Sequence, residues 1–134
     1  MNYEVLKSEI TTDPLTIGYA GMSDAEIAAS LNTVNRTAQK ASLSGDELFA
    51  ASVAAEFAAL TDIKKTLWVS FCGRDSINPY GDSNVEFVKW VFGVGSATVT
   101  ALSAARTYLV SRATELGLGF VYPSQVTGAK AYHA

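Results

Sequence analysis

The amino-acid sequence predicts an all-α protein, a compact bundle of about five to seven helices around a central helical hairpin. Three segments carry a serine followed three residues later by a glutamate, beginning at Ser23, Ser44 and Ser83. In such a capping box the serine side chain accepts a hydrogen bond from the third backbone N–H, and the glutamate reaches back to the serine N–H. Apolar residues follow at helical spacing. Together these patterns indicate a single helical domain over residues 1–134.

The first helix is expected over residues 3–10. Asn2 precedes it and can serve as its N-cap, because a short amide side chain can accept from the first free backbone N–H groups. Asp13-Pro14 closes this segment, since the residue before a proline is pushed out of the helical region of backbone space.

A second helix is expected to begin after Ser23 and to reach about residue 32, with Ile27 and Leu31 buried. The segment that follows, residues 33–43, is polar and basic. Its pattern fits either a continuation of the helix or an exposed connector, and the sequence does not distinguish them.

The central hairpin is predicted over residues 44–74. Ser44 caps its first helix, Thr61-Asp62 starts its second, and Gly73 ends it in the left-handed conformation that glycine adopts easily. The first helix is expected to bury Phe49, Val53, Phe57 and Leu60, and the second Ile63, Leu67 and Phe71.

Residues 84–92 allow two interpretations. Ser83 and Glu86 form the third capping box and favour a helix, whereas the run VEFVKWVF is rich in residues that favour strands. We take the helix as the prediction and keep the strand as the alternative.

The C-terminal part is predicted to contain one long helix and one short helix. Ser96 caps the long helix, which is expected to run to about residue 116. A short extended segment is expected near residues 118–122. Pro123 then opens the last helix, because proline suits the first helical turn.

Composition limits the classes of function. Hydrophobic residues make up 49% of the chain, charged residues only 17%, and the net charge is −3. This is more apolar surface than one small core hides, so part of it is expected to be covered by other subunits. The acidic balance argues against a surface for specific nucleic-acid binding or for an anionic membrane. No membrane-spanning segment is expected.

No group of residues predicts a catalytic site, a cofactor or a metal centre. Gly93-Val94-Gly95 resembles the start of a dinucleotide-binding loop, but Thr98 stands where that loop needs its third glycine. His133 is the only histidine and lies close to the C-terminus. Cys72, the only cysteine, lies in an apolar stripe and is expected to be a small buried side chain. The protein is therefore not expected to be an enzyme.

Residues 26–37 offer one alternative, a DNA-binding regulator. Their pattern is similar to a helix-turn-helix, in which Asn35 and Arg36 would begin the recognition helix. The surrounding segment is electrically neutral, however, and the turn lacks a glycine. An ordinary capped helix is therefore the preferred interpretation.

Tyr80, Trp90 and Tyr122 are the candidates for a subunit interface. Large aromatic side chains dominate both cores and interfaces. Tyr80 and Tyr122 are neighbours of prolines in predicted loops, where an interface and the core are equally expected. Trp90, like Trp68, also fits the core.

Three stretches, residues 6–37, 60–81 and 101–119, resemble a family of small tailed-bacteriophage proteins. The stretches are LKSEITTDPLTIGYAGMSDAEIAASLNTVNRT, LTDIKKTLWVSFCGRDSINPYG and ALSAARTYLVSRATELGLG. The resemblance spans nearly the whole chain and carries no catalytic residues. It implies a protein of the virion or of its assembly, made in the cytoplasm of the bacterial host.

Within that resemblance, the leading hypothesis is a head–tail connector or adaptor subunit that forms an oligomeric ring. Head-to-tail interfaces of a ring would cover the surplus apolar surface. The expected partners are copies of the chain and other virion proteins, such as portal or tail proteins. An acidic lumen would let DNA pass without binding it. Capsid decoration and a tail component are the alternative virion roles.

Overall fold

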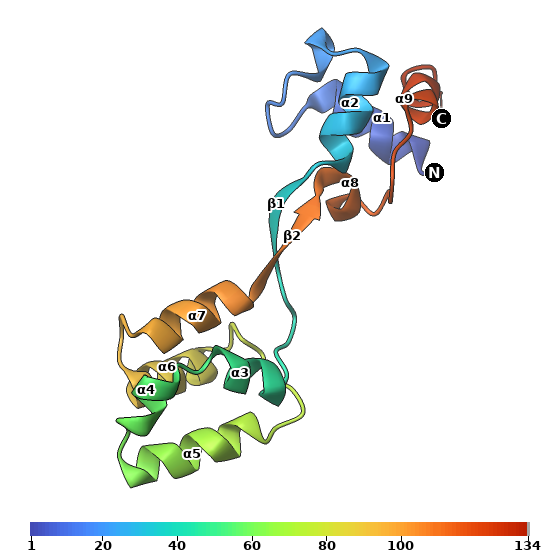
Figure 1. The fold of residues 1–134 in the computed structure, drawn as a ribbon. Coiled ribbons are helices and arrows are strands. Elements are labelled where there is room, and N and C mark those ends of the chain that lie inside the picture. The colour runs from blue at the N-terminus through green and yellow to red at the C-terminus, as the bar shows by residue number, and fades with distance from the viewer. Residues whose placement is uncertain (134) are drawn as a thin grey trace. The chain divides into compact units, whose positions relative to one another are not determined.

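The computed structural model describes residues 1–133 and is mostly helical (Figure 1). The chain forms two compact units. Unit 1 combines residues 1–37 with the C-terminal residues from Leu109 on, and unit 2 is the continuous segment Ala38–Tyr108. Each unit has its own cluster of buried apolar side chains. The sequence predicts one domain with one core over residues 1–134, whereas the structure has two cores.

Unit 1 contains the helices α1 (Tyr3–Thr12), η1 (Tyr19–Gly21, a 3-10 turn), α2 (Asp24–Asn32), α8 (Arg112–Glu115) and α9 (Pro123–Lys130). Helix α9 packs on both α1 and α2, and α8 packs on α2. The two ends of the chain therefore share one core. Its buried residues are Leu6, Tyr19, Ile27, Ala28, Leu31, Ala113, Val121, Val126 and Ala129.

The predicted caps of unit 1 are confirmed. The Asn2 side chain accepts from the backbone N–H of Val5, and Ser23 with Glu26 forms a complete capping box. Helix α1 ends at Thr12, and its C-cap residue, Asp13, takes a left-handed conformation with φ +43°. Its carboxylate accepts from the N–H groups of Ile17 and Gly18, so it closes the loop that follows.

Unit 2 contains α3 (Gly45–Ala51), α4 (Ala54–Ala58), α5 (Asp62–Cys72), α6 (Asp82–Phe92) and α7 (Ala97–Ala105). Helix α3 packs on α5 and α7, and α6 packs on α7. An isolated antiparallel bridge joins Leu43 to Ile77 through backbone hydrogen bonds in both directions, 3.0 and 2.9 Å long. The buried apolar residues are Leu43, Leu48, Trp68, Phe71, Ile77, Val91 and Leu102.

The protein is not purely α-helical as predicted, because it also contains two strands. Strand β1 (Val34–Gln39) pairs with β2 (Thr107–Ser111) in a two-stranded sheet. The segment 33–43, for which the sequence left two interpretations open, does not continue the helix, since residues 34–39 form β1. Strand β2 interrupts the long helix predicted from residue 97 to 116. The run Thr107-Tyr108-Leu109-Val110 favours a strand once a partner is present, because β-branched and aromatic side chains fit a pleated surface.

The predicted first helix of the hairpin is broken at Ser52-Val53. The hydroxyl of Ser52 donates to the carbonyl of Leu48 and accepts from the indole Nε1 of Trp68 at 2.9 Å. The backbone N–H of Val53 donates to the hydroxyl of Thr98. These side-chain contacts replace the helical hydrogen bonds, so a new helix, α4, begins after the break.

The buried face of α5 also differs from the prediction. Phe71 is buried as predicted, but Ile63 and Leu67 are exposed, and Trp68 is buried in their place. Phe49 of α3 is exposed as well. Gly73 ends α5 with φ −77°, which is the right-handed region and not the predicted left-handed one. The predicted buried face of α5 contains Leu67, whereas the face that packs in the core contains the next residue, Trp68.

Helix α6 confirms the helical interpretation of residues 84–92, but its cap is not the predicted one. The N-cap is Gly81, and Ser83 lies inside the helix. Ser96 caps α7 as predicted, by accepting from the N–H of Val99. The carboxylate of Glu56 completes that cap by accepting from the N–H groups of Ala97 and Thr98.

The extended segment predicted near residues 118–122 pairs with neither strand, although Tyr122 does have an extended backbone conformation. Val121 is instead held by the side-chain amide of Asn32, which donates to its carbonyl at 2.7 Å and accepts from its N–H at 2.8 Å. A single side chain thus gives Val121 the pair of hydrogen bonds that a neighbouring strand would provide. Val121 itself is fully buried.

Candidate interaction surface

Tyr80, the first of the predicted interface residues, is largely engaged within unit 2. Its hydroxyl donates to the carbonyl of Arg106 at 3.0 Å, and the Arg106 guanidinium lies over its ring, 4.5 Å from the centroid. Arg106 also donates to the carbonyl of Pro79. Tyr80 therefore links the loop before α6 to the end of α7.

Trp90, the second candidate, lies on the surface of unit 2 and is 52% exposed. The Nζ atom of Lys64 lies 4.8 Å from the centroid of its ring and donates to its carbonyl at 2.8 Å. The first turn of α5 therefore lies beside the last turn of α6. A cation over an indole ring is an attractive contact, so Lys64 holds the ring in place.

Other apolar side chains are exposed on α5 and directly after α6. Ile63 is the chain neighbour of Lys64 and is 68% exposed, and Leu67 is exposed one turn further along α5. Val94 follows directly after the end of α6 and is 80% exposed. We refer to Ile63, Leu67, Trp90 and Val94 as the α5–α6 end. Exposure of several large apolar groups together is typical of a surface that another molecule covers.

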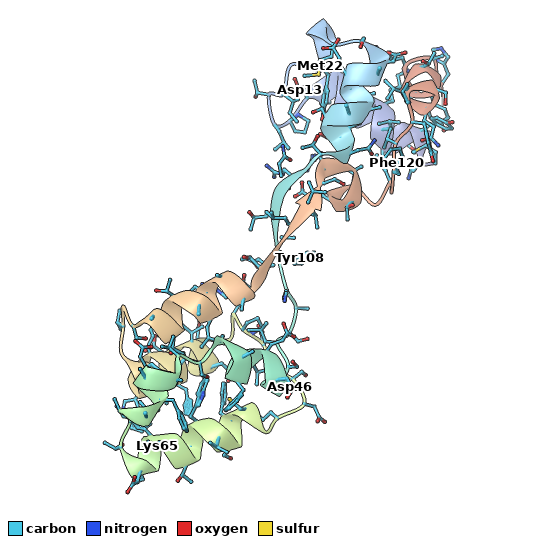
Figure 2. The ribbon with its side chains drawn as sticks, in the orientation of Figure 1. Asp13, Met22, Asp46, Lys65, Tyr108 and Phe120 are labelled. Carbon is cyan, nitrogen blue, oxygen red and sulfur yellow. The ribbon has the colours of Figure 1, made fainter. Side chains whose placement is uncertain are left out.

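Tyr122, the third candidate, lies on unit 1 in the segment between α8 and α9. It is 57% exposed, and Phe120, labelled in Figure 2, is 65% exposed. The two rings meet edge to face with centroids 4.9 Å apart. This pair is a second exposed apolar feature, on the other unit from Trp90.

Sequence reasoning missed most of these residues. Ile63, Leu67 and Phe49 are predicted to be core because they recur at helical spacing, and Phe120 attracts no attention. The available signal was Lys64-Lys65, two charged residues directly after Ile63, together with the serine at position 52 that interrupts the preceding helix. Both features argue against one long buried stripe.

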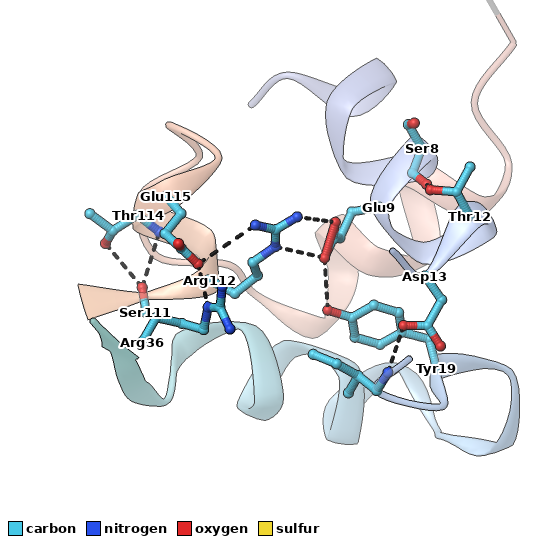
Figure 3. A network of polar contacts seen from close by, with 11 residues as sticks. Ser8, Glu9, Thr12, Asp13, Tyr19, Arg36, Ser111, Arg112, Thr114 and Glu115 are labelled. Atoms are coloured by element: carbon cyan, nitrogen blue, oxygen red, sulfur yellow. Dashed lines mark hydrogen bonds and ion pairs between the residues drawn. The ribbon is translucent and has the colours of Figure 1, made fainter. Parts of the chain in front are cut away.

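Unit 1 also contains a network of charged side chains, shown in Figure 3. The guanidinium of Arg112 lies between Glu9 and Glu115, with Nε 2.8 Å and Nη2 3.0 Å from the two oxygens of Glu9. Arg36 pairs with Glu115 at 2.7 Å. Two carboxylates therefore face two guanidinium groups, and the charges balance.

Glu9 is buried, and its carboxylate also accepts from the hydroxyl of Tyr19 at 3.3 Å. Burial and the neighbouring charge of Glu9 raise the pKa of Tyr19. The hydrogen bonds that Arg112 donates to the Glu9 carboxylate raise the pKa of Arg112 above its ordinary value. Every charge here has a partner, so the network connects α1, the 19–21 turn, β1 and α8 and serves to hold unit 1 together.

The remaining residues singled out in the sequence take ordinary positions. Burial raises the pKa of the Cys72 thiol to about 11, so it is protonated at neutral pH. His133 is exposed. Residues 1–133 contain no cluster of three His, Cys, Asp or Glu side chains able to hold a metal ion. Among the helices of the same residues, none combines the length and apolar character needed to span a bilayer.

The segment proposed as a helix-turn-helix has a different structure. Helix α2 ends at Asn32, and strand β1 follows in place of a recognition helix. Arg36 lies on that strand and pairs with Glu115.

Comparisons of the chain with models of protein families, with curated proteins and with solved structures found no match.

Proposed function

We propose that this chain is a structural protein of a tailed-phage virion and acts as a head–tail connector subunit in a ring of identical copies. The observation that carries the proposal is the exposed α5–α6 end. It presents four exposed apolar side chains on one unit, namely Ile63, Leu67, Trp90 and Val94. The phage resemblance of the sequence supplies the class of assembly.

The chemistry of the α5–α6 end suits a protein–protein contact. Interface cores are enriched in aromatic side chains and depleted of paired charges, and tryptophan is among the commonest residues whose truncation weakens binding. Trp90 is held by Lys64, so little side-chain entropy is lost when a partner covers it. In a ring, this end would meet a different surface of the next copy. The net charge of −3 is compatible with DNA passing an acidic lumen.

The oligomeric state of the purified chain tests the interface. We expect size-exclusion chromatography with light scattering to show a closed oligomer for the wild type. Trp90→Ser and Ile63→Ser should shift it to monomer while circular dichroism stays unchanged. Phe49→Ser is the matched control, because Phe49 is equally exposed on α3 and lies outside the α5–α6 end. A wild type that stays monomeric at every concentration contradicts the proposal.

Mass spectrometry of purified particles tests the virion role. A connector should be present in the mature particle at the low stoichiometry of a ring, in proportion to the portal. A far higher copy number would favour capsid decoration, and co-purification with tails lacking a head would favour a tail component. Absence from mature particles contradicts all three virion roles.

A further inference from the structure

Unit 2 contains an apolar cavity of about 120 Å³ between α6 and α7. Its walls include Val85 and Val88 of α6, Val99 and Leu102 of α7, and Leu43, Leu48 and Ile77 beneath them. The walls come from four separated parts of one compact unit, so the cavity belongs to that unit alone. An apolar cavity of ~150 Å³ in another protein stays dry and binds benzene, so this one suits a group of about that size.

Two cations border the cavity. Lys89 of α6 and Arg106 at the end of α7 both line it, together with the polar side chains of Asn84 and Ser103. Lys89 is half-buried, and within residues 1–133 its Nζ atom makes neither an ion pair nor a hydrogen bond. Its place in the last turn of α6 is favourable for the helix dipole but leaves three N–H donors free.

Arg106 is held in a fixed position with donors to spare. Its guanidinium lies over the ring of Tyr80, and Nη1 donates to the carbonyl of Pro79. A guanidinium has five N–H donors, so one weak hydrogen bond leaves most of them unused. No carboxylate pairs with Arg106 among the described residues.

We propose that this cavity binds a small aromatic monocarboxylate, with the ring among the valines and leucines and the carboxylate between Lys89 and Arg106. The apolar walls account for a ring, the volume limits it to one ring, and the two unpaired cations select an anion. A carboxylate fits the guanidinium geometry in particular, because its two oxygens match two parallel N–H donors. This proposal is independent of the role in the virion.

Benzoate and benzamide provide the test, because the two molecules share a ring and a shape and differ in charge. We expect benzoate to bind the full chain with a Kd on the order of 1 mM. The titration is monitored by nuclear magnetic resonance of the Val and Leu methyl groups. Benzamide should bind at least about fivefold more weakly, since it cannot form the charge-assisted hydrogen bonds. Binding of benzoate should also weaken as salt is added.

Variants locate the site. Lys89→Gln should weaken benzoate at least about fivefold and leave benzamide unchanged. Lys65→Gln is the matched control, because Lys65 is equally half-buried on α5 and does not line the cavity (Figure 2). Val99→Phe should fill the cavity and abolish binding of both molecules.

The wild-type comparison needs no variant to fold. Equal binding of benzoate and benzamide, or no shift of the methyl groups of Val88 and Leu102 with either, overturns the proposal. If Lys65→Gln weakens benzoate binding as much as Lys89→Gln does, the proposal is overturned as well. The effect would then come from the overall charge of the protein.

Discussion

At the scale of single residues, Gly45 determines how closely two helices of unit 2 approach. It is the first residue of α3 and lies against the end of α5. A Cβ atom placed on it would be 1.8 Å from the carbonyl oxygen of Cys72 and 2.8 Å from that of Arg74. Both atoms belong to the backbone, so they cannot turn aside as a side chain would. The start of α3 can therefore seat here only because residue 45 has no side chain.

We predict that Gly45→Ala lowers the free energy of unfolding by about 3 kcal/mol or more, because overpacking forces the backbone to move. Urea denaturation measures the change. Gly21→Ala is the control, since its added Cβ meets no atom within 4 Å and its φ is not positive. That variant should stay within about 0.5 kcal/mol of the wild type. Similar effects at the two positions would contradict the close approach.

Tyr19 makes stability depend on alkaline pH. It is 1% exposed and donates to the carboxylate of Glu9. Its folded-state pKa lies above the ordinary value of 10.0, first because of burial and then because of the negative charge on Glu9. The unfolded chain therefore loses this proton at lower pH than the folded chain. The stabilisation from Tyr19 is complete below pH 10.0 and declines as the pH rises above it.

Comparison of Tyr19→Phe with the wild type isolates this effect, because the other tyrosines are common to both. At about pH 8 the variant should be less stable by about 1–2 kcal/mol, having lost a hydrogen bond to a charged group. At about pH 11 the difference should shrink. The phenol of the wild type then ionises in the unfolded chain, and this lowers the free energy of unfolding of the wild type alone. A difference that grows between the two pH values would mean that the phenol is not buried against Glu9.

At the scale of elements, the helix caps offer a direct comparison. Ser44 and Ser83 carry the same Ser-x-x-Glu pattern, but only Ser44 forms the capping box. We expect Ser44→Ala to lower the free energy of unfolding by about 1 kcal/mol. Ser83→Ala should change it little or raise it slightly, since alanine is the better helix former inside a helix. Chemical denaturation measures both, and equal losses would mean that Ser83 also acts as a cap.

Helix starts could be predicted from the sequence because capping is local. Asn2, Ser23, Ser44 and Ser96 all act as N-caps as predicted, through bonds to residues three positions away. The strands could not be predicted in this way. Residues 34–39 and 107–111 pair across a long sequence separation, so neither segment carries its partner in its own pattern.

The candidate site was predictable only in part, for a related reason. Trp90 and Tyr122 are exposed, but helical spacing alone cannot tell which of two adjacent apolar stripes faces the core. The break at Ser52, between α3 and α4, lets Trp68 of α5 donate to that serine, and with Trp68 facing inward Ile63 and Leu67 are exposed. The cavity beside Lys89 depends on contacts among distant segments and has no signal in the local sequence.

At the scale of the whole molecule, the division into units predicts that a fragment can fold. Residues 38–108 are continuous and contain a complete cluster of buried side chains. The N–H of Lys40 donates to the carbonyl of Arg106, so the ends of this fragment already meet. We expect the fragment to unfold cooperatively, with a free energy of unfolding of no more than about 3–5 kcal/mol, as for other domains of this size.

Fluorescence of Trp68 in a Trp90→Phe background measures that transition, since Trp68 is fully buried. A fragment of residues 1–37 is the comparison. It lacks α8 and α9, which supply part of the core of unit 1, so it should show little helix by circular dichroism. A fragment 38–108 without a cooperative transition would mean that its core needs the rest of the chain.

Because unit 1 combines residues 1–37 with the residues from Leu109 on, it cannot be completed until that second segment has been synthesised. Domains generally fold as units during synthesis, beginning with those whose residues emerge first. All residues of unit 2 are synthesised before unit 1 is complete, although unit 2 is translated after the N-terminal helices. Nascent α1 and α2 would remain without α9 during that interval, and a chaperone acting on this protein would encounter them at that stage.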